Sequence, residues 1–349
     1  MRKLLRNFLL VSLLQFSACE MAFAQDTRSS PEIEQMFAQV KDYEKRLDFA
    51  DAIVVLNQAL AIEPGNLKIR RELASCLLQT GNYPEILNKF AGDERDAKMD
   101  SIIFFCLTTA NARTGNIREA NRLFKKCLAV YPHYGELYHE LGLLLEQNNP
   151  DKAVETWRSG VVHAPRCAAN YFELCRAYYK SGMYTDCIFC GEIFVNLENK
   201  QNTEIRDAKT MLFESYKALF RTSDSHGKKK KDHDAISASN ILFAQQNIDS
   251  ILFSLTPVVS DGVTADNLAM LRTRMLIVWY SSERKQTPGL IAYQDHLLRN
   301  GWFDIYNEWL FGEANDTLQY KSWNSFHIHA IDSFLNWKNE HISEFLLTN

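Results

Sequence analysis

The sequence predicts an all-α protein, a right-handed superhelical stack of helix hairpins closed by a degenerate helical C-terminal cap. Three observations support this fold class. Turn residues and prolines recur at a spacing of 34 residues, the apolar side chains between them follow a helical period, and glycine and proline are few. With 14 Gly and 8 Pro in 349 residues, many short strands joined by tight turns are not expected.

The repeat is visible in residues that return at fixed offsets. Gly81 and Gly115 lie 34 positions apart, Pro64 and Pro132 lie twice as far apart, and Pro165 follows Pro132 after 33 positions. In residues 101–134, Phe104 and Leu107 are the first apolar positions, Gly115 is the turn, Ala120 the small contact, Phe124 the second aromatic and Pro132 the closing proline. In residues 135–167, the corresponding positions are Tyr138, Leu141 with Gly142, Ala153, Trp157 and Pro165. This pattern resembles the tetratricopeptide repeat, a helix–turn–helix unit, and residues 296–312 are similar to the C-terminal cap of secreted bacterial members.

Each offset has a physical reason. A small residue such as Ala120 lets the two helices of a hairpin approach closely, and the ring of Phe124 fills the wedge between hairpins. Glycine at the turn adopts a positive φ after the first helix. Because a single hairpin cannot bury its apolar face alone, about three or more hairpins must stack.

The expected organisation has four parts. A signal peptide (1–24) and a linker (25–32) precede an array of about five repeats (33–201), and divergent helical repeats with a C-terminal cap occupy residues 202–349. A Lys-rich loop is expected at 221–234. Further helices are expected at 204–220, 235–255, 263–284, 289–299, 302–311 and about 320–347. Four of the six tryptophans lie from Trp302 to Trp337, as expected of a cap that seals the end of a stack.

The N-terminal segment has the pattern of a secretory signal. Three basic residues within the first six positions precede an apolar stretch over residues 8–16, which is shorter than the ~20 residues that a membrane span needs. A small-x-small site ending at Ala24 predicts cleavage before Gln25. The residues before Cys19 also resemble a lipobox, so a lipid anchor at Cys19 is the less favoured alternative. We therefore expect an exported chain that is periplasmic or held in the cell envelope.

Several function classes are disfavoured. The formal net charge of −4 argues against a nucleic-acid partner, which would need a basic face. The sequence holds no nucleophile elbow, phosphate-binding loop, dinucleotide fingerprint or zinc-protease motif, so no cofactor and no enzymatic activity are expected. We expect no membrane span beyond the N-terminal segment.

The remaining feature is a surface. The first helices of successive hairpins line the concave face of such an array, and the inward positions mix basic and aromatic residues. They are Lys68, Arg71, Arg113, His139, Phe172, Arg176, Tyr179 and Lys180. Such a groove suits an extended acidic or C-terminal peptide of a partner protein, although these positions are equally those of a solvated polar face. The alternative is a structural or assembly subunit that uses the convex face and the aromatic cap.

Cysteines, histidines and paired glutamates are the other side chains that could carry out chemistry. The cysteines are expected to be buried thiols, with a Cys175–Cys187 disulfide as the sharper alternative, because those two positions meet in the repeat. His327 and His329 point apart on a helix and predict no metal site, and His139 reads as a surface histidine. Glu192 and Glu198 have the spacing of a solvated helix face.

Overall fold

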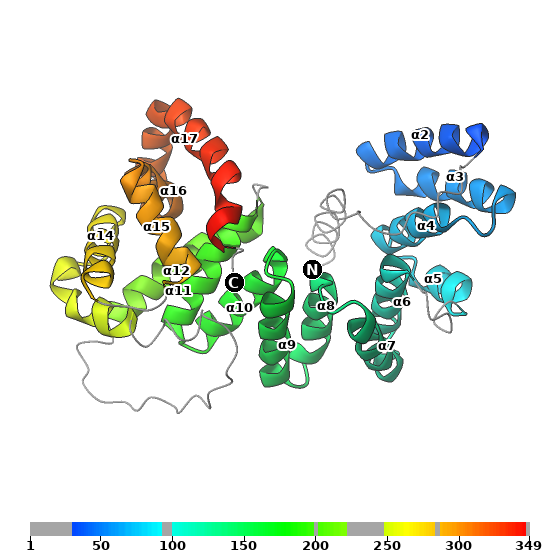
Figure 1. Ribbon diagram of the computed structural model, residues 1–349, viewed down its shortest axis with the longest axis horizontal. Helices are drawn as coiled ribbons and strands as arrows, with labels where there is room; N and C mark the ends of the chain where they lie inside the picture. The colour runs from blue at the N-terminus through cyan, green and yellow to red at the C-terminus, as the bar shows by residue number, and fades with distance from the viewer. Residues whose placement is uncertain (1–29, 93–99, 199–201, 222–247, 283–286, 347–349) are drawn as a thin grey trace. The chain divides into compact units, whose positions relative to one another are not determined.

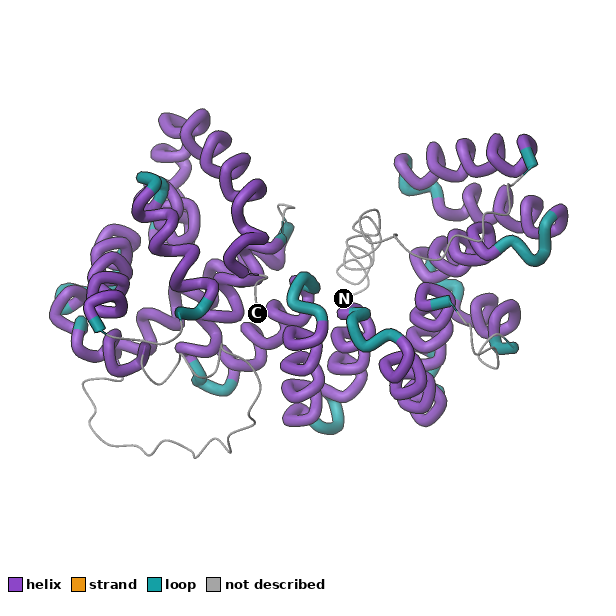
Figure 2. The backbone as a smooth tube through the Cα atoms, in the orientation of Figure 1, coloured by secondary structure: helices purple, strands orange, loops and turns teal. Residues whose placement is uncertain are grey.

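The computed structural model describes residues 30–92, 100–198, 202–221, 248–282 and 287–346, and every regular element in these ranges is helical (Figures 1 and 2). The all-α prediction is confirmed. The predicted signal peptide, Cys19, most of the linker and all of the Lys-rich loop beyond residue 221 lie outside the described residues. The chain divides into two compact units, Met1–Asn148 and Asn149–Asn349, and each is described by itself.

Unit 1 (Met1–Asn148) is a succession of helix hairpins. Its helices are α2 (Pro31–Lys45), α3 (Phe49–Ile62), α4 (Leu67–Gln79), α5 (Tyr83–Phe90), α6 (Ser101–Arg113), α7 (Ile117–Val130) and α8 (Gly135–Glu146). Helix α4 packs against α5 of its own hairpin and against α6 of the next, and α6 packs against α7 and α8 in the same way. The core follows the expected register, because Ala120 and Phe124 of α7 are fully buried.

The hairpin turns explain the recurring glycines. Gly81 and Gly115 follow their helices with φ of 68° and 85°, a region that L side chains rarely adopt. The next amide, that of Asn116, donates to the carbonyl of Asn111 at 2.9 Å and closes the helix end. At the equivalent position of the first hairpin, Leu47 takes a φ of 62°. Gly182 and Gly301 repeat the same geometry in the second unit.

Unit 2 (Asn149–Asn349) continues the hairpins and adds further helices. They are α9 (Pro150–His163), α10 (Ala168–Lys180), α11 (Tyr184–Leu197), α12 (Thr203–Arg221), the 3-10 helix η4 (Thr256–Val259), α14 (Ala265–Ser281), α15 (Gly289–Arg299), α16 (Phe303–Asn315) and α17 (Thr317–Leu346). Residues 248–254 are also helical. Helix α11 packs against α10, α12 and α17, and α16 packs against α12, α14, α15 and α17.

Two glycines allow close helix contacts in unit 2. A Cβ added to Gly160 would lie 2.7–2.8 Å from the Asn170 side chain, and one added to Gly191 would lie 2.8 Å from Cys175 Sγ. Both distances are too short for a real contact. These positions therefore set how closely α10 approaches its two neighbours.

The centre of unit 2 is a buried polar network. Arg272 of α14 forms an ion pair with Glu192 of α11 and hydrogen-bonds Asn307 of α16. Glu192 Oε1 also accepts hydrogen bonds from Gln294 Nε2 at 2.8 Å and from the Tyr306 hydroxyl at 2.7 Å. All five side chains are buried.

The expectation that Glu192 and Glu198 lie on a solvated helix face is wrong. Glu192 is fully buried and Glu198 is nearly so. The reason is that helices from residues 265–346 cover α11, and no local spacing within α11 reports that cover.

Two lysines lie beside one buried tryptophan. Lys209 Nζ is 3.7 Å from the Trp309 ring centroid and donates to the Trp309 carbonyl at 2.6 Å, while Lys338 Nζ donates to the Asn196 carbonyl at 3.0 Å. Burial lowers the pKa of Lys209 to about 7 and that of Lys338 to about 8.

The cysteines of the described residues are free thiols. Cys175 and Cys187 meet as expected, with their Sγ atoms 3.5 Å apart, but no disulfide joins them. The hydrogen bond between Cys175 and Cys187, together with burial, raises the pKa of Cys175 well above its usual value, and burial does the same for Cys190. These thiols behave as small buried groups, not as reactive thiolates.

Candidate functional site

The predicted groove residues divide evenly between the units. Lys68 and Arg71 on α4, Arg113 on α6 and His139 on α8 belong to unit 1. Phe172, Arg176, Tyr179 and Lys180, all on α10, belong to unit 2. The two sets are therefore described one unit at a time.

Arg71 neutralises a buried carboxylate. Its guanidinium lies 2.6 Å from Asp100 Oδ2, and Asp100 is buried. Asp100 also caps α6, because its Oδ1 accepts a hydrogen bond from the Ile102 amide at 3.0 Å. The pair therefore has a structural role in joining α4 to the start of α6.

Arg113 has the same arrangement one hairpin later. Its Nη2 lies 3.0 Å from Oε2 of Glu140, a buried residue of α8. His139, expected at the surface, is buried, and its Nδ1 lies 3.8 Å from Glu140 Oε1. The interpretation of His139 as a surface histidine is wrong, because the residue is only 4% exposed.

Lys68 remains accessible. Its Nζ is 4.0 Å from the Phe37 ring centroid and 3.7 Å from Glu34 Oε1, and the side chain is about half exposed. An exposed ion pair of this kind is worth under about 1 kcal/mol, so it would not hold Lys68 against a partner carboxylate.

In unit 2, α10 presents only part of the expected stripe. Arg176 Nε donates to Glu173 Oε2 at 2.7 Å, and Glu173 is buried. Phe172 is also buried, and its ring centroid lies 5.0 Å from that of Phe194. Tyr179 is half-buried, with its ring edge-on to Tyr184 at 6.4 Å. Lys180 is exposed at the end of the helix.

The three arginines share one property that the sequence did not reveal. Arg71, Arg113 and Arg176 each pair with a buried acidic side chain, and each remains between 26% and 33% exposed. Truncating any of them would leave a buried carboxylate without its cation. The accessible cations of the predicted set are therefore Lys68 and Lys180, with partial access to the guanidinium groups.

Unit 1 also holds a pair of carboxyl groups, Glu44 on α2 and Glu72 on α4. Burial and the nearby charge of Glu44 raise the pKa of Glu72 to about 7, and Glu44 accepts a hydrogen bond from Cys76 Sγ at 3.6 Å. Burial likewise raises the pKa of Glu44. Two carboxyls that share a proton can act as a general acid and base, but such a pair is also common where charges are simply buried together.

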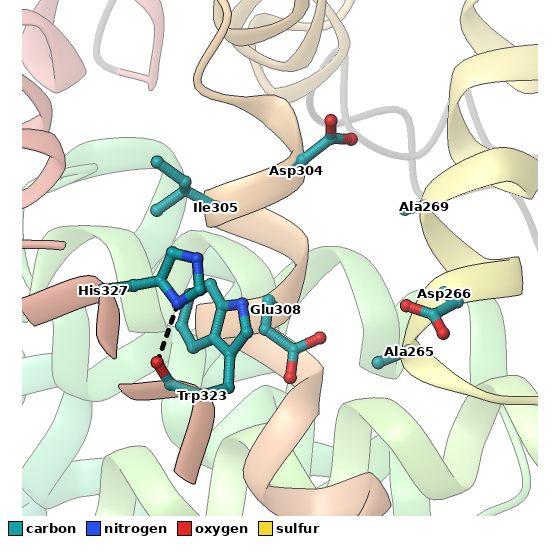
Figure 3. A pocket seen from close by; sticks show the side chains of 8 residues that line it. All are labelled: Ala265, Asp266, Ala269, Asp304, Ile305, Glu308, Trp323 and His327. Atoms are coloured by element: carbon teal, nitrogen blue, oxygen red, sulfur yellow. Dashed lines mark hydrogen bonds between the residues drawn. The ribbon is translucent and has the colours of Figure 1, made fainter. Parts of the chain in front are cut away.

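A pocket in unit 2 was not predicted. It has a volume of about 330 Å³ and lies between α14, α16 and α17. Its lining consists of Ala265, Asp266, Ala269, Asp304, Ile305, Glu308, Trp323 and His327 (Figure 3). Figure 3 shows the carboxylates of Asp266 and Glu308 on facing helices, with the His327 ring laid against the Trp323 indole.

The pocket is acidic with one aromatic wall. The Trp323 and His327 rings stack with centroids 4.6 Å apart and planes 16° apart. Burial, and then the charge of Asp266, raises the pKa of Glu308, while His327 opposes that shift. The only sequence signal was the i, i+4 spacing of Asp304 and Glu308, which an exposed helix face shares.

Metal binding finds no support in the described ranges. No group of three or more His, Cys, Asp or Glu side chains there has the geometry to hold an ion. Across the same ranges, no helix combines the length and the apolar character that crossing a membrane requires.

Comparison with known protein families finds a similarity over one segment of unit 1. The sequence model of the tetratricopeptide repeat family matches residues 47–85, which cover all of α3 and α4 and the start of α5. The match begins at the turn residue Leu47 and contains the turn at Gly81. No curated protein matches the chain.

Proposed function

We propose that this tetratricopeptide repeat protein is a non-catalytic interaction scaffold of the bacterial cell envelope, which binds a peptide segment or protein partner on the face formed by its first helices. The observation that carries the proposal is the repeat itself. Hairpins that bury Ala120 and Phe124 between them leave exposed cations at the ends of their first helices, Lys68 on α4, Arg113 on α6 and Lys180 on α10, where a partner has access.

The chemistry of that face suits an acidic segment. Lys68 and Lys180 are exposed, and part of each guanidinium of Arg71, Arg113 and Arg176 faces solvent. An arginine has five N–H donors, so one that bonds an internal carboxylate retains donors for a second acceptor. Each charge-assisted contact to a partner would be worth about 1.5–3 kcal/mol.

The cellular location rests on the N-terminal pattern. Basic residues before a short apolar stretch and a small-x-small site at Ala24 support export, with a mature chain that begins at Gln25. This part of the proposal is independent of the partner-binding face and can fail without it.

A second candidate function has one observation in its favour. The C-terminal helices expose Leu318 and Phe326 of α17 beside the acidic pocket, and large exposed apolar residues commonly mark interaction sites. A structural or assembly subunit would use this end of the molecule in place of the repeat face.

Charge reversal at the two accessible lysines tests the proposal. The tagged chain is used to capture partners from an envelope fraction, and Lys68→Glu and Lys180→Glu are compared with Lys152→Glu, an exposed position on the second helix of its hairpin. We expect the first two changes to weaken capture at least about tenfold each, by analogy with other charge-assisted contacts, and the third to have no effect. Equal capture by all three variants would contradict the groove.

A further inference from the structure

Helix α17 exposes an unusual amount of apolar surface. Leu318 is 79% exposed, Phe326 is 83% exposed and Ile328 is 50% exposed. The opposite side of the helix faces the rest of unit 2, because Ile331, Phe334 and Lys338 are buried. A phenylalanine this exposed on a well-formed helix indicates a surface that another molecule covers.

Two exposed residues of opposite charge lie on either side of Phe326 and Ile328 along this helix. Lys321 and Asp332 are both exposed, and neither forms an ion pair with another described residue. They are separated by 11 positions, about three helical turns, so they lie on the same flank of the exposed face. Ile328 lies between them on that flank, and Phe326 lies on the other flank.

We propose that α17 pairs with α17 of a second copy of this chain, antiparallel and around a twofold axis that crosses the exposed face at the level of Phe326. In an antiparallel symmetric pair, each flank of one helix meets the same flank of the other. Lys321 then faces Asp332 of the partner subunit, and the contact occurs twice. Phe326 and Ile328 both lie next to the axis, where each side chain meets its own copy.

The centre of the exposed face carries two small side chains and one imidazole. Ser322, Ser325 and His329 lie between the two flanks, and all three are exposed. A lipid surface or a partner of one charge sign would not use both Lys321 and Asp332, whereas a second copy satisfies both at once. This charge complementarity selects the self-pair among the occupants that an apolar helix face could have.

Sedimentation equilibrium of the full chain tests the proposal. We expect a monomer–dimer equilibrium with a dissociation constant on the order of 10 µM, because a single helix pair is a small interface. Lys321→Asp and Asp332→Lys should each weaken the dimer about tenfold, since each replaces two attractive contacts with two repulsive ones. Phe326→Ser should weaken it at least as much. All three positions are exposed, so helix content and melting temperature should not change.

Mixing Lys321→Asp with Asp332→Lys is the decisive experiment for the pairing. In a mixed dimer, Asp at 321 of one chain faces Lys at 332 of the other, and Asp332 of the first faces Lys321 of the second, so both contacts are attractive again. An equimolar mixture should therefore dimerise with about the affinity of the parent chain, while each variant alone does not. A parent chain that stays monomeric at 100 µM would overturn the proposal. A dimer that ignores both charge changes, or variants that fail to pair on mixing, would equally overturn it.

Discussion

The buried ion pair at the centre of unit 2 gives the sharpest energetic prediction. Arg272 and Glu192 are both fully buried, and the Arg272 guanidinium carbon lies 5.2–5.5 Å from the ring centroids of Phe303, Tyr306 and Phe311. Burial, the largest single influence, would lower the pKa of Arg272, but Glu192, Tyr216 and Tyr306 together outweigh it and the pKa is raised. Glu192 is the largest of these favourable influences on the Arg272 charge.

The magnitudes follow from what each change leaves behind. Glu192→Gln keeps the shape and the acceptor for Gln294 and Tyr306, but it leaves the Arg272 cation in the core without a counter-ion. Arg272→Met leaves the Glu192 carboxylate with those two neutral donors alone. Each single change should cost about 3–5 kcal/mol of unfolding free energy. The double change removes both charges together, so it should cost less than about 2 kcal/mol, less than either single change.

Urea unfolding followed by tryptophan fluorescence measures this cycle directly. All six tryptophans lie in unit 2, so the signal reports the unfolding of that unit alone. The reasoning predicts a coupling energy of at least about 3 kcal/mol between the two positions. Additive costs, with the double variant as unstable as the sum of the singles, would refute it, because the two charges would then not depend on one another.

Three further predictions concern packing, protonation and processing. Ala120→Glu places a charge at a fully buried position and should cost more than about 3 kcal/mol; a circular dichroism melt within a degree or two of the parent would show that the hairpin register is wrong. Lys209 has a folded-state pKa of about 7 against about 10.5 when unfolded, so the unfolded chain binds the extra proton between these values and stability rises with pH there. Between pH 7 and 9, urea unfolding of the parent should gain about 2–3 kcal/mol more than Lys209→Met, and parallel pH profiles would count against a buried neutral lysine. Mass spectrometry of the exported chain should find Gln25 at the N-terminus, and a lipid-modified Cys19 would contradict the signal-peptide assignment.

The sequence predicted most of the fold because the repeat is encoded locally. A turn needs glycine at a positive φ, and Gly81 and Gly115 supply it at the expected spacing. Ala120 and Phe124 are buried as their offsets predicted. The turn at Leu47 was not predicted, because leucine rarely adopts a positive φ. Its φ of 62° nevertheless matches that of the glycines at the other hairpin turns.

The details of the candidate site could not be predicted, because they depend on contacts between distant segments. Arg176 reads as a surface cation in any helical wheel, and only its contact with buried Glu173 shows that removing it would destabilise α10. The burial of Glu192 depends on Arg272 and Tyr306, which follow it by 80 and 114 positions. The acidic pocket likewise forms where α14 meets α16 and α17, and no pattern within any one of these helices indicates that contact.

Site-specific photo-crosslinking in living cells tests the proposed partner-binding face most directly. A benzophenone amino acid replaces Lys68 or Lys180 on first helices, and Asp51 or Glu155 on second helices serve as matched exposed controls. The proposal predicts an adduct with a partner protein from Lys68 in unit 1 and from Lys180 in unit 2, each judged separately, and none from the two controls. Adducts from Asp51 or Glu155, with none from the lysines, would contradict binding on the face of the first helices.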